Sequence, residues 1–226
     1  VHIPTVERHG DAWTKPGNII GNGAFTLEVW RLNDRIALRK NPFYWNADQV
    51  RMETVDVIPA ARASTAFNIY ATGGADLMMD KGLAPVPLLD KLRERPDFHS
   101  APFLGTYFVR FNTTKKPLDD PRVRRALALA VDRDLLVRKI TKAGEVPALS
   151  FVPPGTAGYE PPPGPGTDRD LARKLLAEAG YPGGKGIPTL SYLYKGDSEL
   201  DRDLAVELQA MWKRELGIAI ALAGQE

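Results

Sequence analysis

The strongest constraint on the fold is a strand, helix and strand pattern near the end of the chain. Residues 188–194 form a short apolar segment, residues 200–216 have the periodicity of an amphipathic helix, and Gly217 is placed to end it. A second apolar segment, residues 218–222, follows directly. Two strands joined through a helix run parallel, so this βαβ unit predicts an α/β fold. Because the last strand comes so close to Glu226, we expect the natural chain to continue.

The first part of the chain predicts a different sheet. Apolar and polar residues alternate over residues 24–30 and again over residues 36–39, and Asn33 and Asp34 stand between them. This pattern is typical of a β-hairpin with one buried face. Further strands are predicted at residues 54–58 and 75–79, on either side of a helix at residues 61–71.

Helices and loops alternate through the middle of the chain. We predict a surface helix at residues 86–95, extended chain at residues 98–111, and a long helix at residues 121–140 capped by Asp119 or Asp120. Residues 147–166 are rich in proline and glycine, which excludes regular structure and indicates a long loop or linker. Thr167 or Asp168 is then expected to cap a helix over residues 171–179.

Composition excludes several classes of function. The chain has no cysteine and only three histidines, which removes thiol nucleophiles, zinc fingers and iron–sulfur ligation. A net charge of +2 gives no electrostatic footprint for nucleic acid. No apolar run approaches the ~18 residues that span a bilayer, and no metal-binding, phosphate-binding or nucleophile motif is present. We therefore expect no catalytic residue, metal or cofactor.

Aromatic residues are the most informative group. Four of them crowd one predicted extended segment, at Phe103, Tyr107, Phe108 and Phe111. Side chains alternate between the two faces of extended chain, so these rings cannot all enter one core. We interpret the remainder as the lining of a cleft that holds an extended peptide by stacking and backbone hydrogen bonds.

Several motifs, in their order, resemble one known family. The first are Asn22-Gly23-Ala24-Phe25-Thr26-Leu27, the run from Asn33 to Trp45, and Gly74-Ala75-Asp76-Leu77. The most specific is the run from Phe111 through Lys116-Pro117-Leu118-Asp119-Asp120-Pro121-Arg122-Val123-Arg124-Arg125-Ala126-Leu127 to Arg133. Residues 176–181 and 212–218 complete the pattern, which resembles the periplasmic oligopeptide-binding proteins of ABC importers, the family 5 extracellular solute-binding proteins.

The resemblance implies a periplasmic binding protein-like (type II) bilobal fold, of which this would be a partial chain with mixed sheets and βαβ units. Residues 1–104 would belong to the first lobe and residues 105–226 to the second, with a hinge near Gly105. The family positions that line the peptide cleft correspond here to Met79, Asp80, Lys81, Tyr107, Phe108, Arg110, Tyr194 and Lys195. An asparagine is common after the tyrosine in that family, and Lys195 departs from it.

The resemblance further implies a function. The full-length protein would be a monomeric receptor, periplasmic or extracellular and lipid-anchored, that passes oligopeptides to the membrane permease of an ABC transporter without catalysis. Two alternatives stay open. One is a metal-independent hydrolase that uses Asp80 or Asp119 with water, and the other is a scaffold or chaperone-type interaction domain in which residues 147–166 contact a partner protein.

Overall fold

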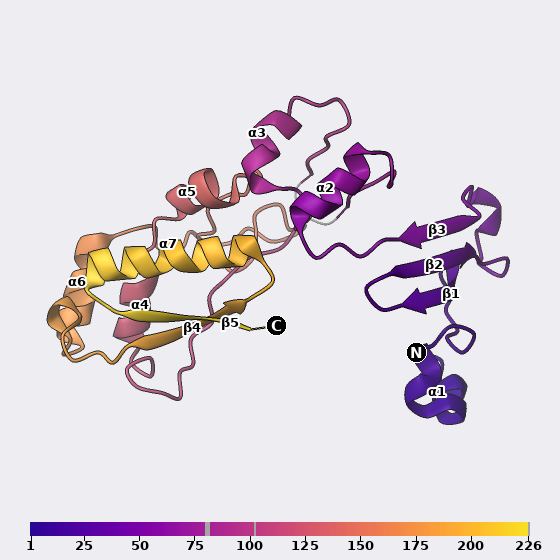
Figure 1. The fold of residues 1–226 in the computed structure, drawn as a ribbon. Coiled ribbons are helices and arrows are strands. Elements are labelled where there is room, and N and C mark those ends of the chain that lie inside the picture. Colours follow the sequence, from indigo (N-terminus) through magenta and orange to yellow (C-terminus); the bar gives the residue numbers. More distant parts are fainter. Residues whose placement is uncertain (80–81, 102, 226) are drawn as a thin grey trace. The chain divides into compact units, whose positions relative to one another are not determined.

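The computed structural model describes residues 1–79, 82–101 and 103–225. The chain divides into two compact units, Val1–Met79 and Asp80–Glu226. Each unit has its own sheet, three-stranded in the first and two-stranded in the second (Figure 1). The predicted boundary between residues 104 and 105 concerns the lobes of the full-length protein and stays a prediction.

The first unit is built on a small antiparallel sheet with the strand order β1-β2-β3. Its helices and strands are α1 (Ile3–His9), η1 (Gly10–Thr14), β1 (Phe25–Arg31), β2 (Arg35–Lys40), η2 (Ala47–Gln49), β3 (Thr54–Val57) and α2 (Ala63–Ala71). The predicted hairpin is confirmed, with Arg31 opposite Arg35 and a turn in which Asn33 has φ 56°. Asparagine tolerates this left-handed conformation better than most residues.

The strand predicted at residues 75–79 is wrong. No strand is assigned there, and Gly74 donates its backbone N–H to the Ile69 carbonyl in the turn that ends α2. The described sheet ends at β3, and this segment does not pair with either of its edges. Apolar residues predict which segments could pair, but a strand forms only where a hydrogen-bonding partner lies beside it.

The second unit contains the βαβ fold predicted from the end of the chain. Its elements are η3 (Val86–Leu88), α3 (Leu89–Leu92), α4 (Pro121–Leu129), α5 (Arg133–Leu135), the π-helical η4 (Leu136–Thr141), α6 (Arg169–Glu178), η5 (Pro182–Gly184), β4 (Leu190–Lys195), α7 (Glu199–Leu216) and β5 (Ile220–Gln225). β4 and β5 pair in parallel, with Leu190 opposite Ile220 and Lys195 opposite Gln225, and α7 lies along them (Figure 1).

The core of the second unit lies between helices α4, α6 and α7 and one face of the β4–β5 pair. Val123, Leu127, Leu176 and Met211 are almost fully buried there. The indole N–H of Trp212 donates to the Leu127 carbonyl at 2.9 Å, so the one polar atom of this buried ring is satisfied. This core fixes the direction of β4 relative to α7.

The long helix predicted at residues 121–140 is interrupted. Asp120 caps it as expected, accepting a hydrogen bond from the Arg122 backbone N–H at 2.8 Å, but α4 ends at Leu129. Asp132 then caps a new helical turn by accepting from the Leu135 N–H at 2.9 Å. Helix-capping aspartates compete with helix continuation. The backbone carbonyls left free by the break accept other hydrogen bonds: the Thr167 hydroxyl donates to the Val131 carbonyl, and the Asp168 backbone N–H donates to the Leu129 carbonyl.

Other predictions for the second unit have mixed outcomes. Asp168 caps α6 by accepting from the Leu171 N–H at 2.9 Å, and residues 147–166 contain no helix or strand, both as predicted. The surface helix predicted at residues 86–95 is shorter and partly internal. It consists of η3 and α3 alone, and both Leu89 and Leu92 are buried.

Candidate functional site

The candidate site in the second unit is formed by the end of β4, the start of α7 and residues 106–111. In parallel α/β units, ligands bind beyond the carboxyl ends of the strands. Tyr194 and Lys195 are the last residues of β4, and Ser198 caps α7 immediately afterwards by accepting from the Asp201 N–H at 3.2 Å. Two of the predicted residues therefore lie at the carboxyl end of a strand in a parallel pair.

Tyr194 is held against the neighbouring strand. A Cβ atom on Gly224 would lie 3.3 Å from the Tyr194 hydroxyl and 3.2 Å from the Cα of Gly196. The glycine in β5 therefore leaves room for the tyrosine ring, which is half-buried. Lys195 points to solvent and forms an ion pair with Asp197 at 3.3 Å.

Residues 106–111 alternate between two environments. Val109 and Phe111 pack against the core of the second unit, whereas Arg110 is exposed. Phe108 makes an edge-to-face contact with Phe151, with ring centroids 5.0 Å apart, and is half exposed. The expectation that the aromatic residues of this segment divide between a core and another surface is therefore confirmed.

Tyr107 is half exposed, and its phenol lies within electrostatic reach of Tyr192 and Asp201 in the βαβ unit. Partial burial is the main cause that raises the pKa of Tyr107, and interactions with the Tyr192 hydroxyl and the Asp201 carboxylate raise it further. The pKa of Tyr192 is raised as well, chiefly by burial. The phenols of both tyrosines therefore stay protonated at neutral pH.

Tyr192 and Asp201 were missed from sequence. Tyr192 lies two residues before Tyr194 and so shares its face of the strand, which was an available signal. The sequence gives no such signal for Asp201, because an acidic residue in the first turn of a helix is usually explained by its interaction with the helix dipole.

The remaining predicted residues are Met79, Asp80 and Lys81. Met79 belongs to the first unit, and its side chain is exposed. Asp80 and Lys81 lie outside the described residues. The structure therefore brings Tyr107 together with Tyr192 and Asp201, and it places Phe108 and Arg110 on the same segment as Tyr107.

Three further observations concern the function classes considered above. Asp119, the aspartate of the hydrolase alternative, is exposed and precedes the cap of α4. Within residues 1–79, 82–101 and 103–225, no group of three or more histidine, aspartate or glutamate side chains is arranged to hold a metal ion. In the same ranges no helix has both the length and the apolar character to cross a lipid bilayer.

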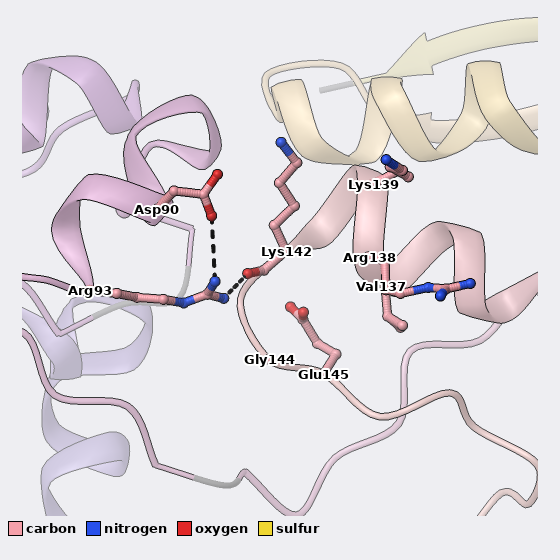
Figure 2. Close-up of a pocket in the computed structure, with 8 residues that line it drawn as sticks. All are labelled: Asp90, Arg93, Val137, Arg138, Lys139, Lys142, Gly144 and Glu145. Atoms are coloured by element: carbon pink, nitrogen blue, oxygen red, sulfur yellow. Dashed lines mark hydrogen bonds and ion pairs between the residues drawn. The ribbon is translucent and has the colours of Figure 1, made fainter.

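A separate pocket of about 450 Å³ lies between α3 and the loop after η4 (Figure 2). Arg93 bridges its two sides, pairing with Asp90 at 3.5 Å and donating to the Lys142 carbonyl. Glu145 accepts from Thr141 and from the Ala143 backbone N–H. The charged groups are thus largely engaged with the protein itself, and the side chains of Arg138 and Lys142 point in different directions (Figure 2).

Comparisons with known proteins agree on one family. The family described as bacterial extracellular solute-binding proteins, family 5 Middle, matches residues 1–226. The periplasmic oligopeptide-binding protein OppA of Escherichia coli is 39% identical over 229 residues, which cover 98% of this chain and 41% of OppA. The periplasmic murein peptide-binding protein MppA of the same organism is 36% identical over 225 residues, covering 96% of this chain and 41% of MppA.

Solved structures give the same result. An oligopeptide-binding protein of Borrelia burgdorferi superposes with a TM-score of 0.89 at 32% identity, covering 99% of this chain and 44% of that one. OppA of Haemophilus influenzae, solved in complex with the peptide RPPGFSPFR, superposes with a TM-score of 0.81 at 28% identity, covering 100% of this chain and 45% of that one. The chain thus spans about two fifths of the length of its curated relatives, and it belongs to the family 5 bacterial extracellular solute-binding proteins, whose fold is the type II bilobal one.

Proposed function

We propose that this chain is part of a peptide-binding receptor of an ABC peptide importer. The full-length protein would bind extended oligopeptides without breaking any bond and deliver them to a membrane permease. The observation that carries the proposal is the family match along the whole chain to relatives whose names describe oligopeptide and murein peptide binding. Those names also support a periplasmic location, and we propose that the receptor acts there as a monomer.

Partly exposed aromatic rings on β4 and on residues 106–111 support the same function. Tyr107, Phe108 and Tyr194 offer flat surfaces that contact a ligand with little loss of side-chain entropy. Arg110 and Lys195 add exposed positive charge. A receptor that accepts many sequences needs contacts of this kind, because they do not depend on one ligand side chain. Met79, Asp80 and Lys81 are proposed to complete the surface from the first lobe.

We also retain the two-lobe division as a proposal, with residues 1–104 in the first lobe, residues 105–226 in the second and a hinge near Gly105. Binding would then favour a closed state in which the ligand contacts both lobes.

The proposal is tested on the full-length protein. Mass spectrometry of ligands that copurify with it should find short peptides, and calorimetry should detect binding of tri- to pentapeptide mixtures. Replacing Tyr107 with alanine should weaken binding about tenfold, as expected for a central aromatic contact. The matched control is Tyr159→Ala, a similarly exposed tyrosine within residues 147–166, which should bind like the parent.

Two results would overturn the proposal. Release of cleaved products from the peptide mixture would favour the hydrolase alternative, with Asp119→Asn as the variant to examine. Absence of any heat or retained peptide would favour a scaffold, and loss of partner binding after deletion within residues 147–166 would then support that role.

A further inference from the structure

One asparagine of this chain differs from the others in the residue that follows it. Asn22 precedes Gly23, whereas the other asparagines precede isoleucine, aspartate, proline, alanine or threonine. The backbone nitrogen that follows an asparagine can attack the carbon of its side-chain amide. Glycine hinders this attack least, because it has no Cβ atom and its backbone reaches the widest range of conformations.

The structure leaves both reacting groups of this pair unengaged. Residues 20–23 are exposed, and residues 19–24 belong to no helix or strand. Within residues 1–79, 82–101 and 103–225, neither the Asn22 side-chain amide nor the Gly23 backbone N–H has a hydrogen-bond partner. The Gly23 carbonyl does accept from the Asn41 side chain, at 2.9 Å. The chain is therefore held just after the reacting atoms and not at them.

Two other asparagines are hindered because their side chains are engaged. Asn41 is buried, accepts from the Phe43 backbone N–H at 3.0 Å, and precedes Pro42, which has no N–H to provide the attacking nitrogen. Asn112 is exposed, but its side-chain oxygen accepts from the Thr114 backbone N–H at 3.1 Å and from the Thr114 hydroxyl at 2.7 Å. Such local contacts fix the side chain of an asparagine against its own backbone.

In the remaining four asparagines the attacking nitrogen is engaged or held in a helix. The backbone N–H that follows Asn18, Asn33 and Asn46 donates in each case to a backbone carbonyl of the same turn. Asn68 lies inside α2. In the part of the chain that the structure describes, only Asn22 thus combines a following glycine with a free side-chain amide and a free backbone nitrogen.

We propose that Asn22 is a modification site at which the protein deamidates spontaneously, with water as the reagent. The Gly23 nitrogen bonds to the side-chain carbonyl carbon of Asn22, the bond from that carbon to Nδ2 breaks, and Nδ2 leaves as ammonia with the Gly23 amide proton. Water then opens the cyclic imide at either carbonyl, which leaves aspartate or isoaspartate at this position. Each product adds one carboxylate, so the formal net charge of +2 falls by one. The inference does not depend on the proposed peptide-binding function.

The test follows this reaction in the full-length protein. The protein is incubated in mildly alkaline buffer made with heavy-oxygen water, and fragments are mapped by mass spectrometry. Asn22 should become an acid that carries the heavy oxygen about tenfold faster than Asn112 does, because Asn22 precedes a glycine and has a free side chain. Asn112 is the internal control, since it is equally open to solvent and differs in those two respects.

Two variants separate the parts of the mechanism. Gly23→Ala keeps the asparagine and should slow its loss about tenfold. It should fold like the parent, because the added Cβ would meet only the Phe25 carbonyl oxygen, at 3.9 Å. Asn22→Gln keeps an amide whose ring closure is slower, and it should remove the acidic species that ion-exchange chromatography of the aged parent resolves.

Three results would overturn the inference. One is that Asn22 is converted no faster than Asn112 in the parent. Another is that Gly23→Ala loses its Asn22 amide as fast as the parent does. The third is that the acid formed at position 22 carries no heavy oxygen, since it would then not arise by hydrolysis of the imide. None of these results bears on whether the receptor binds peptides.

Discussion

At the scale of single residues, the Glu215 carboxylate in the second unit forms ion pairs with three arginines. This carboxylate is largely buried. Its oxygens lie 2.8 Å from a guanidinium nitrogen of Arg214, 3.3 Å from one of Arg173 and 3.4 Å from one of Arg169. These arginines come from α6 and α7, so one carboxylate ties two helices together. The hydrogen bond from Arg214 is the main cause that lowers the pKa of Glu215.

Replacing Glu215 with glutamine should destabilise the second unit by about 1–2 kcal/mol, because three cations lose a largely buried partner. Asp170→Asn is the matched control, since its ion pair with Arg173 at 2.7 Å involves a 95% exposed carboxylate and should be worth less than about 0.5 kcal/mol. Urea unfolding of the two variants measures the difference. Equal free energies of unfolding would show that the cluster contributes nothing.

The same residue predicts a pH dependence. A carboxylate whose pKa is lowered by folding stabilises the folded state above its unfolded pKa of about 4.3, and that stabilisation is lost as the pH falls through the lower folded value. The free energy of unfolding should therefore drop in acid less steeply for Glu215→Gln than for the parent.

At the scale of elements, the end of α7 shows how two turns fit together. Gly217 ends the helix with φ 70°, and a Cβ atom there would lie 2.3 Å from the Gly183 carbonyl oxygen in η5. The position is thus closed to other residues both by its conformation and by a neighbouring backbone.

Gly217→Ala should therefore cost about 2–3 kcal/mol of stability, more than the roughly 1 kcal/mol that a left-handed alanine costs alone. Gly158→Ala isolates the second effect, because Gly158 has φ 73° and nothing lies within 4 Å of its added Cβ. Comparing denaturant midpoints of the two variants checks the prediction. A Gly217→Ala variant no less stable than Gly158→Ala would refute the close contact.

Local signals predicted most elements of the fold but not where their partners lie. The caps at Asp120 and Asp168 and the stop at Gly217 act through their immediate neighbours, so they could be recognised from sequence. The break after Leu129 could not. It depends on donors from Thr167 and Asp168, which are distant in sequence and supply hydrogen bonds that replace those of a continued helix.

The candidate site shows the same limit. Resemblance to a family indicated Tyr107, Tyr194 and Lys195, all on segments now described. The proximity of Tyr107 to Tyr192 and Asp201 involves residues far apart in sequence, and no spacing or motif indicates it. Asp80 and Lys81 lie outside the described residues, so their role stays a prediction.

At the scale of the whole molecule, the two units differ greatly in buried core. Among the described residues, the buried apolar side chains of the first unit are only Ala37 and Ala66. The second unit has a continuous cluster that includes Leu127, Met211 and Trp212. Apolar burial is the main source of folding stability. The backbone amides of the two units should therefore differ in how strongly they are protected against hydrogen exchange.

Hydrogen exchange of the 226-residue chain should reveal this difference. Amides of α4 and α7 are expected to exchange slowly, at rates set by global unfolding of the second unit, and those of β1 and β2 much faster, through local opening. Mass spectrometry of peptic fragments gives both rates in one experiment. Equal protection of β2 and α7 would show that the first unit draws stability from a source other than its own core.

The placement of Trp212 has a practical consequence for spectroscopy. It is one of four tryptophans and the single one in the second unit, where its indole is buried; Trp30 and Trp45, in the first, are largely open to water. Intrinsic fluorescence thus comes from the buried Trp212, the partly buried Trp13 and the more exposed Trp30 and Trp45. A quencher in solution, such as iodide, would reduce the emission of Trp45 most and that of Trp212 least, so the emission that resists quenching is enriched in a native optical probe of this half of the chain.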